Sequence, residues 1–170
     1  GPVVGGNLRT MYALDAEQAK LVDEYTLGLP KLVMKAMDAA MKAKQPVKLC
    51  KGVGTCGFAV NRRENKEVDV PKLRAEKQHL KGRVDHDVPV IAAQNGEGKI
   101  VGIIFGYACH ATTLAFQKWF GDYPGFAAIE LQKTIPTAVA MYWAGCGADQ
   151  NPIPRRSLDL AKEYGTQRSE

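Results

Sequence analysis

The sequence predicts a single α/β domain over residues 1–170, in which helices flank a layered mixed β-sheet. Two observations lead to this fold class. Segments with the period of a helix alternate with short apolar segments that have the length of strands. The later apolar segments, at 99–109 and 137–144, are apolar enough to lie inside a covered sheet. With 170 residues, the chain is long enough to bury one hydrophobic core.

The first expected helix covers residues 15–44, where apolar side chains recur at helical spacing. Asp15 is a suitable N-cap for it. Gly28 and Pro30 lie near its middle, and a proline inside a helix removes a backbone hydrogen bond and clashes with the preceding turn. We therefore expect the helix to kink or split there.

Strands are expected next, at 46–52 and 58–62, around a glycine turn. The strongly charged segment 63–82 shows no clear apolar face, so we expect a charged surface excursion with a short helix. The apolar segments 88–93 and 99–109 are joined by Gln-Asn-Gly-Glu-Gly, and an Asn-Gly pair favours a turn between strands. These two segments predict a β-hairpin.

The last third of the chain predicts a helix, a strand and a second helix. Asp122 is expected to cap a helix at 124–133. A buried strand is expected at 137–144, followed by a loop rich in glycine and proline at 145–154. The final helix is expected at 158–164, ending near the next glycine.

The composition is that of an ordinary globular protein, with 45% hydrophobic and 24% charged residues. No apolar stretch approaches the ~20 residues that cross a bilayer, and no signal peptide is visible, so the compartment stays open. Much of the net charge of +5 lies between 31 and 83 without interleaved aromatic residues, so we expect no nucleic-acid partner. The same charge allows a peripheral membrane contact. An oligomer is possible.

Two strand ends carry the residues best suited to chemistry. His110 follows the apolar segment 99–109, and Asp149 lies in the glycine-rich loop after 137–144. Ligands of open α/β sheets bind beyond the carboxyl ends of the strands, so parallel pairing of these strands would place both residues in one cleft. His110 alone fits a histidine at the core edge, a metal ligand or a general base. Asp149 alone fits a polar group in that cleft or an Asx-turn.

Several common catalytic motifs are missing from the sequence. It has no Gly-x-Ser-x-Gly turn, and its two serines, Ser157 and Ser169, lie in polar surroundings. It has no Gly-x-x-x-x-Gly-Lys phosphate loop and no His-x-x-x-His pair. The four cysteines form no Cys-x-x-Cys pair, so we expect thiols rather than a structural zinc site or disulfides. His79 and His86 lie among charged residues and are expected at the surface.

Five short blocks occur in order along most of the chain. They are Asn61-Arg-Arg63, Val84-Asp-His-Asp-Val-Pro-Val90, Phe105-Gly-Tyr-Ala-Cys-His-Ala-Thr-Thr113, Gly121-Asp-Tyr-Pro-Gly125 and Gly145-Cys-Gly-Ala-Asp-Gln-Asn-Pro152. In their order and spacing they resemble the N-terminal domain of the neutral/alkaline non-lysosomal ceramidase family. Each block alone is weakly specific, whereas all five in order are fairly specific.

This resemblance implies a zinc-dependent amidase that cleaves the N-acyl bond of ceramide, a lipid-like substrate, with His110 as one zinc ligand. In the family a second histidine comes from an upstream His-Thr-His-Ser-Gly-Pro motif. The start of this chain, Gly1-Pro2-Val-Val-Gly-Gly6, resembles the tail of that motif. The remaining ligands, a Glu and a Tyr, are expected beyond residue 170. The resemblance thus implies an internal fragment of a longer enzyme, often secreted or periplasmic, and weak zinc binding by this chain alone.

The resemblance also assigns other residues to the site. Family members carry a serine in a Gly-Asp-Val-Ser-Pro loop, and alignment on the aspartate and proline of that loop puts Asn151 at the serine position. Asn151 cannot be acylated, but its amide could donate a hydrogen bond to a developing oxyanion. Asp149 is expected to orient a ligand or water, while Thr112, Thr113 and Tyr107 are expected to bind the substrate.

Three functions follow as hypotheses. The first is a zinc-dependent hydrolase of an amide or ester bond, which turns over slowly as the isolated chain. The alternative is a non-catalytic, truncated α/β domain that binds a small ligand or a protein partner in the same cleft. A nucleic-acid binder that uses the basic middle segment is a third hypothesis, and it predicts a steep loss of affinity with salt.

Overall fold

The computed structural model describes residues 12–116 and 118–169, so the expected motif tail at 1–6 lies outside the described residues. The chain divides into two compact units, Gly1–Gln45 and Pro46–Glu170, and each is described by itself. None of the helices in the described ranges combines the length and the apolar character needed to cross a membrane.

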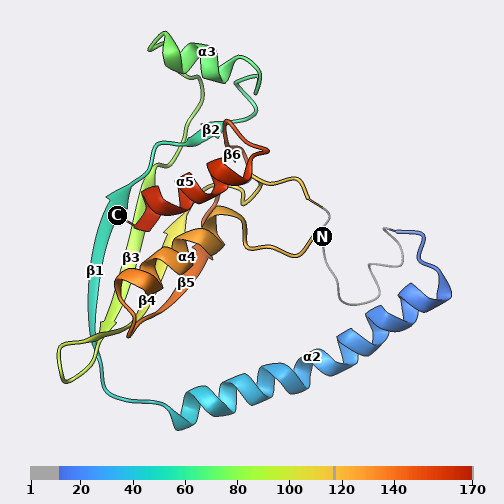
Figure 1. Ribbon diagram of the computed structural model, residues 1–170, viewed down its shortest axis with the longest axis vertical. Helices are drawn as coiled ribbons and strands as arrows, with labels where there is room; N and C mark the ends of the chain where they lie inside the picture. Colours follow the sequence, from blue (N-terminus) through green and yellow to red (C-terminus); the bar gives the residue numbers. More distant parts are fainter. Residues whose placement is uncertain (1–11, 117, 170) are drawn as a thin grey trace. The chain divides into compact units, whose positions relative to one another are not determined.

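The first unit is built on one long helix, α2 (Ala16–Lys42), shown in blue in Figure 1. Asp15 caps it as predicted: its carboxylate accepts from the Gln18 N–H at 2.8 Å, and the Gln18 side chain accepts from the Asp15 N–H at 3.4 Å. The helix continues through Gly28 and Pro30, so the expected split is wrong. Helix-favouring residues on both sides keep the flanking turns intact. Every side chain of α2 is at least partly exposed.

The second unit is organised around a four-stranded sheet, which confirms the predicted mixed α/β architecture (Figure 1). The strands β3 (Asp87–Gln94) and β4 (Ile100–Tyr107) form the predicted antiparallel hairpin. β1 (Lys48–Thr55) pairs antiparallel with β3, and β5 (Val139–Ala144) pairs parallel with β4. The strand order is therefore β1-β3-β4-β5.

Two helices cover one face of this sheet (Figure 1). Helix α4 (Asp122–Thr134) makes the crossover that parallel strands require, and α5 (Leu158–Ser169) packs beside it. Aromatic rings fill much of the core beneath them. Phe58 packs edge-on against Tyr107 and stacks on Tyr164, with ring centroids 5.1 and 4.2 Å apart.

Two predicted helix boundaries are wrong. The N-cap of α4 is Gly121, because the carboxylate of Asp122 turns back to the segment before the helix. The final helix does not end near Gly165 but continues to 169. A Cβ at Gly165 would lie 2.5 Å from the Cβ of Phe126 in α4, so this glycine allows close helix packing rather than ending a helix.

In the described part of the chain, the face of the sheet opposite the helices is open and apolar. The sequence predicts a buried strand at 137–144, but β5 lies at the edge of the sheet. Trp143 is 70% exposed and Met141 is 51% exposed. β4 occupies the central position, because β3 pairs with one of its edges and β5 with the other. Ile91 and Ile104 extend the same open face.

Strands β2 (Ala59–Asn61) and β6 (Gln150–Pro152) form a separate antiparallel pair. β6 lies within the predicted loop 145–154, and every residue of the pair is buried. The pairing fixes the loop after β5 against the segment that begins the charged excursion.

The excursion at 63–82 contains the predicted short helix, α3 (Val70–Ala75). It is more firmly packed than its charge indicates, because Val70 is fully buried against Val60 and Ile153. A single valine on one turn is too sparse a pattern to predict this contact from the sequence.

Two arginines add polar anchors to the excursion. Arg74 donates to the carbonyls of Ile153 at 2.5 Å and of Gly57 at 3.0 Å. Arg155 pairs with Glu67, with Nη2 and Oε2 2.6 Å apart. The hydrogen bond from Arg155, helped by its charge, lowers the pKa of Glu67 below its ordinary value.

Candidate functional site at the end of β4

The carboxyl ends of β4 and β5 meet, as parallel pairing predicts. The Gly145 N–H donates to the Tyr107 carbonyl at 2.9 Å, and the His110 N–H donates to the Gln150 carbonyl at 2.9 Å. A Cβ at Gly147 would come within 2.5 Å of backbone atoms that follow β4, so the loop requires glycine at this point. The two segments therefore form one continuous surface.

We call residues 109–113 and 145–152 together the strand-end site. Within it, Nε2 of the His110 ring lies 3.2 Å from the Ala148 carbonyl oxygen. A carbonyl only accepts hydrogen bonds, so Nε2 carries a proton, and in the neutral ring Nδ1 then keeps its lone pair. The same carbonyl accepts from the Arg62 guanidinium at 2.9 and 3.1 Å. Metal-binding histidines are commonly oriented in this way, through the nitrogen that does not bind the metal.

Asp149 is held from the start of the charged excursion. Asn61 Nδ2 donates to Asp149 Oδ2 at 3.0 Å, and the Arg62 N–H donates to the Asp149 carbonyl at 2.8 Å. Asn61 makes an Asx-turn, the type of turn that was one alternative for Asp149. Its Oδ1 accepts from the N–H groups of Arg63 and Glu64. The sequence block at 61–63 thus positions the loop that contains the block at 145–152.

Asp122 orders the threonine pair of the strand-end site. It is 3% exposed, and its carboxylate accepts from the N–H groups of Thr113 and Leu114 at 3.1 and 2.8 Å. It also accepts from the Tyr123 N–H at 2.8 Å. Among the described residues, the hydroxyl oxygens of Thr112 and Thr113 are buried without a hydrogen-bond partner. Such groups are uncommon, and they mark places where a ligand or water can bond.

Tyr107 and Asn151 are also buried, at 1% and 6% exposed. The Tyr107 hydroxyl donates to the Cys56 carbonyl and accepts from the Ala59 N–H, so it bonds to core backbone. Asn151 lies in β6 opposite Val60. Both residues therefore have structural positions, and their expected roles in substrate binding and oxyanion stabilisation stay predictions.

The block at 84–90 also reaches the strand-end site. The Gln150 side chain accepts from the Asp85 N–H at 3.1 Å. His86 is only half-buried, and its Nε2 lies 3.1 Å from the Ala59 carbonyl oxygen. The His86 ring therefore contacts a backbone carbonyl through Nε2, as the His110 ring does.

Sequence reasoning missed four positioning residues: Asn61, Arg62, Asp122 and Gln150. Each bonds to atoms distant in the sequence, and such bonds leave no local periodicity to detect. The signal that could have found them is their place inside the five blocks. Hydrogen bonds connect the blocks at 61–63, 84–90 and 121–125 to the strand-end site, which the other two blocks form.

The described residues contain no group of three or more His, Cys, Asp or Glu placed to hold a metal ion. Zinc sites need three or four ligands in fixed geometry. The described residues of the strand-end site therefore do not form a complete zinc site.

Comparison with known proteins finds the likeness in structure alone, since no family model and no curated protein matches the chain. A ceramidase complexed with C2 has a TM-score of 0.59 at 18% identity, over 75% of this chain and 22% of that one. The neutral ceramidase from Pseudomonas aeruginosa has a TM-score of 0.58 at 17% identity, over 88% and 24%. The chain shares the fold of part of these ceramidases and spans less than a quarter of their length.

Proposed function

We propose that the chain is part of a hydrolase related to the neutral ceramidases, that it contributes to cleavage of an amide or ester bond, and that His110 is one of its zinc ligands. The His110 ring carries this proposal, because Ala148 holds Nε2 at 3.2 Å and leaves the Nδ1 lone pair available. The fold likeness to ceramidases and the hydrogen bonds that join the other sequence blocks to the strand-end site support it.

The zinc ion needs ligands in addition to His110, and the family resemblance expects them outside the described residues. When bound, zinc would polarise a substrate carbonyl and make its bound water more acidic. The chain's own contribution is the placement of one imidazole at a rigid strand end. Asp149, which is oriented by Asn61, would orient a water or a polar group of the substrate.

Thr112 and Thr113 carry two buried hydroxyl groups without a hydrogen-bond partner among the described residues, and these would bond to a substrate that reaches them. An amide or ester carries a carbonyl oxygen and neighbouring polar atoms that such groups recognise. Asn151 is an amide, and it cannot serve as a covalent nucleophile as serine does. Chemistry at this position would therefore rely on hydrogen bonding by Asn151 rather than on an acyl-enzyme formed there.

Zinc titration of the purified chain tests the proposed ligand. We expect weak, saturable binding, because a single protein imidazole holds zinc poorly. His110→Ala should weaken this binding at least tenfold. His86→Ala is the matched control, since the His86 ring also bonds a backbone carbonyl through Nε2. Equal zinc affinity in His110→Ala and the original chain would contradict the proposal.

The reaction class is tested with a panel of N-acyl amides and p-nitrophenyl esters. We expect slow hydrolysis that depends on zinc and is lost in His110→Ala. Hydrolysis that persists unchanged in this variant would place the chemistry elsewhere. Ligand binding without any turnover would favour the alternative, a non-catalytic α/β domain.

A further inference from the structure

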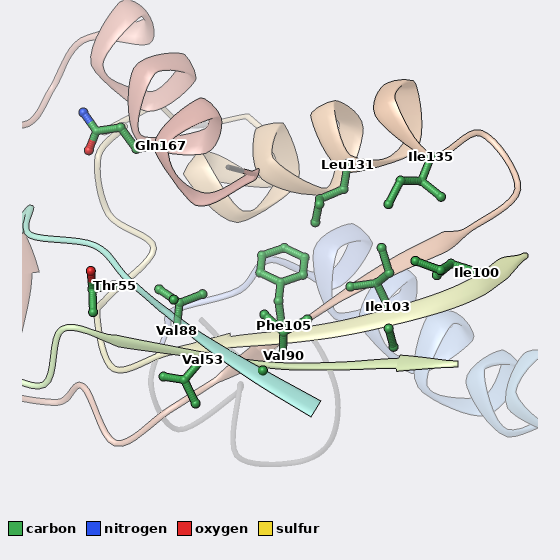
Figure 2. Close-up of a pocket in the computed structure, with 13 residues that line it drawn as sticks. Val53, Thr55, Val88, Val90, Ile100, Ile103, Phe105, Leu131, Ile135 and Gln167 are labelled. Atoms are coloured by element: carbon green, nitrogen blue, oxygen red, sulfur yellow. The ribbon is translucent and has the colours of Figure 1, made fainter. Parts of the chain in front are cut away.

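An apolar groove runs between the sheet and the helices of the second unit (Figure 2). Its volume is about 420 Å³, within the range of ~300–1,000 Å³ common for small-molecule sites. Strands β1, β3 and β4 line one side, and α4 lines the other, together with the end of α5. None of its lining residues belongs to the strand-end site.

The groove exists because β1 carries glycines where side chains would otherwise fill it. Gly52 pairs with Val90 and Gly54 pairs with Val88, and strand alternation turns these positions toward the helices. A Cβ at Gly52 would meet no described atom within 4 Å, and one at Gly54 would meet only the Val88 Cβ at 3.9 Å. The space beside β1 is therefore large enough to take further carbon atoms.

The two ends of the groove differ in polarity, as Figure 2 shows. Two polar residues, Thr55 of β1 and Gln167 of α5, lie at one end, and Ile100 and Ile135 lie at the other. The lining residues in the described chain include no charged side chain. A sugar or nucleotide would leave its polar groups unpaired against such walls. A linear alkyl chain with an uncharged polar head matches both ends.

We propose that this groove binds the alkyl chain of a single-chain amphiphile, with its tail toward Ile100 and Ile135 and its head toward Thr55 and Gln167. Phe105 and Ile103 of β4, which are both largely buried, form the floor of the groove. This site is independent of the proposed zinc ligand, so either proposal can fail while the other holds.

The first test uses 1-decanol as the probe and the methyl NMR signals of the groove as the readout. We expect saturable shifts at Ile100, Ile103, Leu131 and Ile135. In the series from hexanol to decanol, affinity should rise about fourfold for each buried methylene. No saturable shift, no dependence on chain length, or shifts concentrated at the open-face residue Met141 would overturn the proposal.

The second test fills the groove. Gly52→Leu should lower decanol affinity at least tenfold while leaving the chain folded, because its side chain enters open space and glycine is a weak residue inside strands. Gly52→Ala should have a smaller effect in the same direction. Gly96→Leu is the control, since a Cβ there also meets nothing within 4 Å and it lies in the hairpin turn. Full decanol affinity in a folded Gly52→Leu or Gly52→Ala variant would overturn the proposal.

Discussion

At the scale of single residues, the Ala148 carbonyl determines which nitrogen of His110 is available. It accepts from the ring Nε2 and from Arg62, so the ring and the guanidinium share one acceptor. Because a backbone carbonyl has no side chain to replace, the ring orientation depends on the loop position, which Asn61 and Asp149 fix. Asn61 and Arg62, which lie outside the predicted site, therefore help to orient its most important side chain.

Asp122 is the residue whose loss should disturb the strand-end site most. Removing its carboxylate in Asp122→Ala leaves three buried N–H groups unpaired, which should lower the free energy of unfolding by about 3 kcal/mol or more. Asp122→Asn should cost less, because it keeps one acceptor oxygen and because asparagine tolerates the φ of 52° at this position. Urea unfolding measures both variants.

Asp159→Asn provides the control for this comparison, because Asp159 lies exposed in the first turn of α5. It should change the unfolding free energy by less than about 0.5 kcal/mol. Equal stability of Asp122→Ala and Asp159→Asn would show that the buried carboxylate does not order the threonine pair.

Tyr164 gives the molecule a stability change at high pH. Burial raises its pKa from 10.0 to about 12, and its hydroxyl donates to the Pro154 carbonyl at 2.7 Å. Below pH 10 both the folded and unfolded states hold the proton; between 10 and 12 the unfolded state loses it first, so stability falls as pH rises. Tyr164→Phe should be less stable at neutral pH, and its deficit should shrink above pH 10.

Urea unfolding of both proteins across this pH range measures the difference. Tyr25→Phe serves as the control, because Tyr25 is 48% exposed on α2. A deficit of Tyr164→Phe that stays constant with pH would contradict the raised pKa.

At the scale of elements, local patterns predicted those whose environment is also local. The capped helix α2, the Asn-Gly hairpin and the β4–α4–β5 crossover were all visible as spacing and turn residues. The elements that the sequence predicted wrongly depend on which other elements pack against them in the fold. β5 has the composition of an interior strand, but its place at the sheet edge follows from strand order, which composition does not encode.

The glycines of α4 and α5 show the same distinction. Gly165 lies against Phe126, so Gly165→Ala should push the two helices apart and cost about 1–3 kcal/mol. Gly125 has no atom within 4 Å of its would-be Cβ, so Gly125→Ala should gain about 0.5–1 kcal/mol from helix propensity. Thermal unfolding should therefore shift in opposite directions, and a stabilising Gly165→Ala would disprove the close packing.

At the scale of the whole molecule, the predicted meeting of two parallel strand ends was correct, because sheet topology alone brings 110 and 149 together. The rest of the site could not be predicted from single motifs. Its second layer comes from Asn61, Asp85 and Asp122, which lie far apart in the sequence and meet only in the fold. The order of the sequence blocks therefore located the strand-end site, whereas the contacts that fix it appear only in the folded chain.

The nitrogen NMR spectrum of the three imidazole rings, recorded at alkaline pH with and without zinc, tests this account most directly. We predict that His110 carries its proton on Nε2 and that zinc shifts its Nδ1 signal at lower concentration than any signal of His79 or His86. His110 protonated on Nδ1, or zinc shifts confined to His79 and His86, would contradict the assignment of His110 as a zinc ligand.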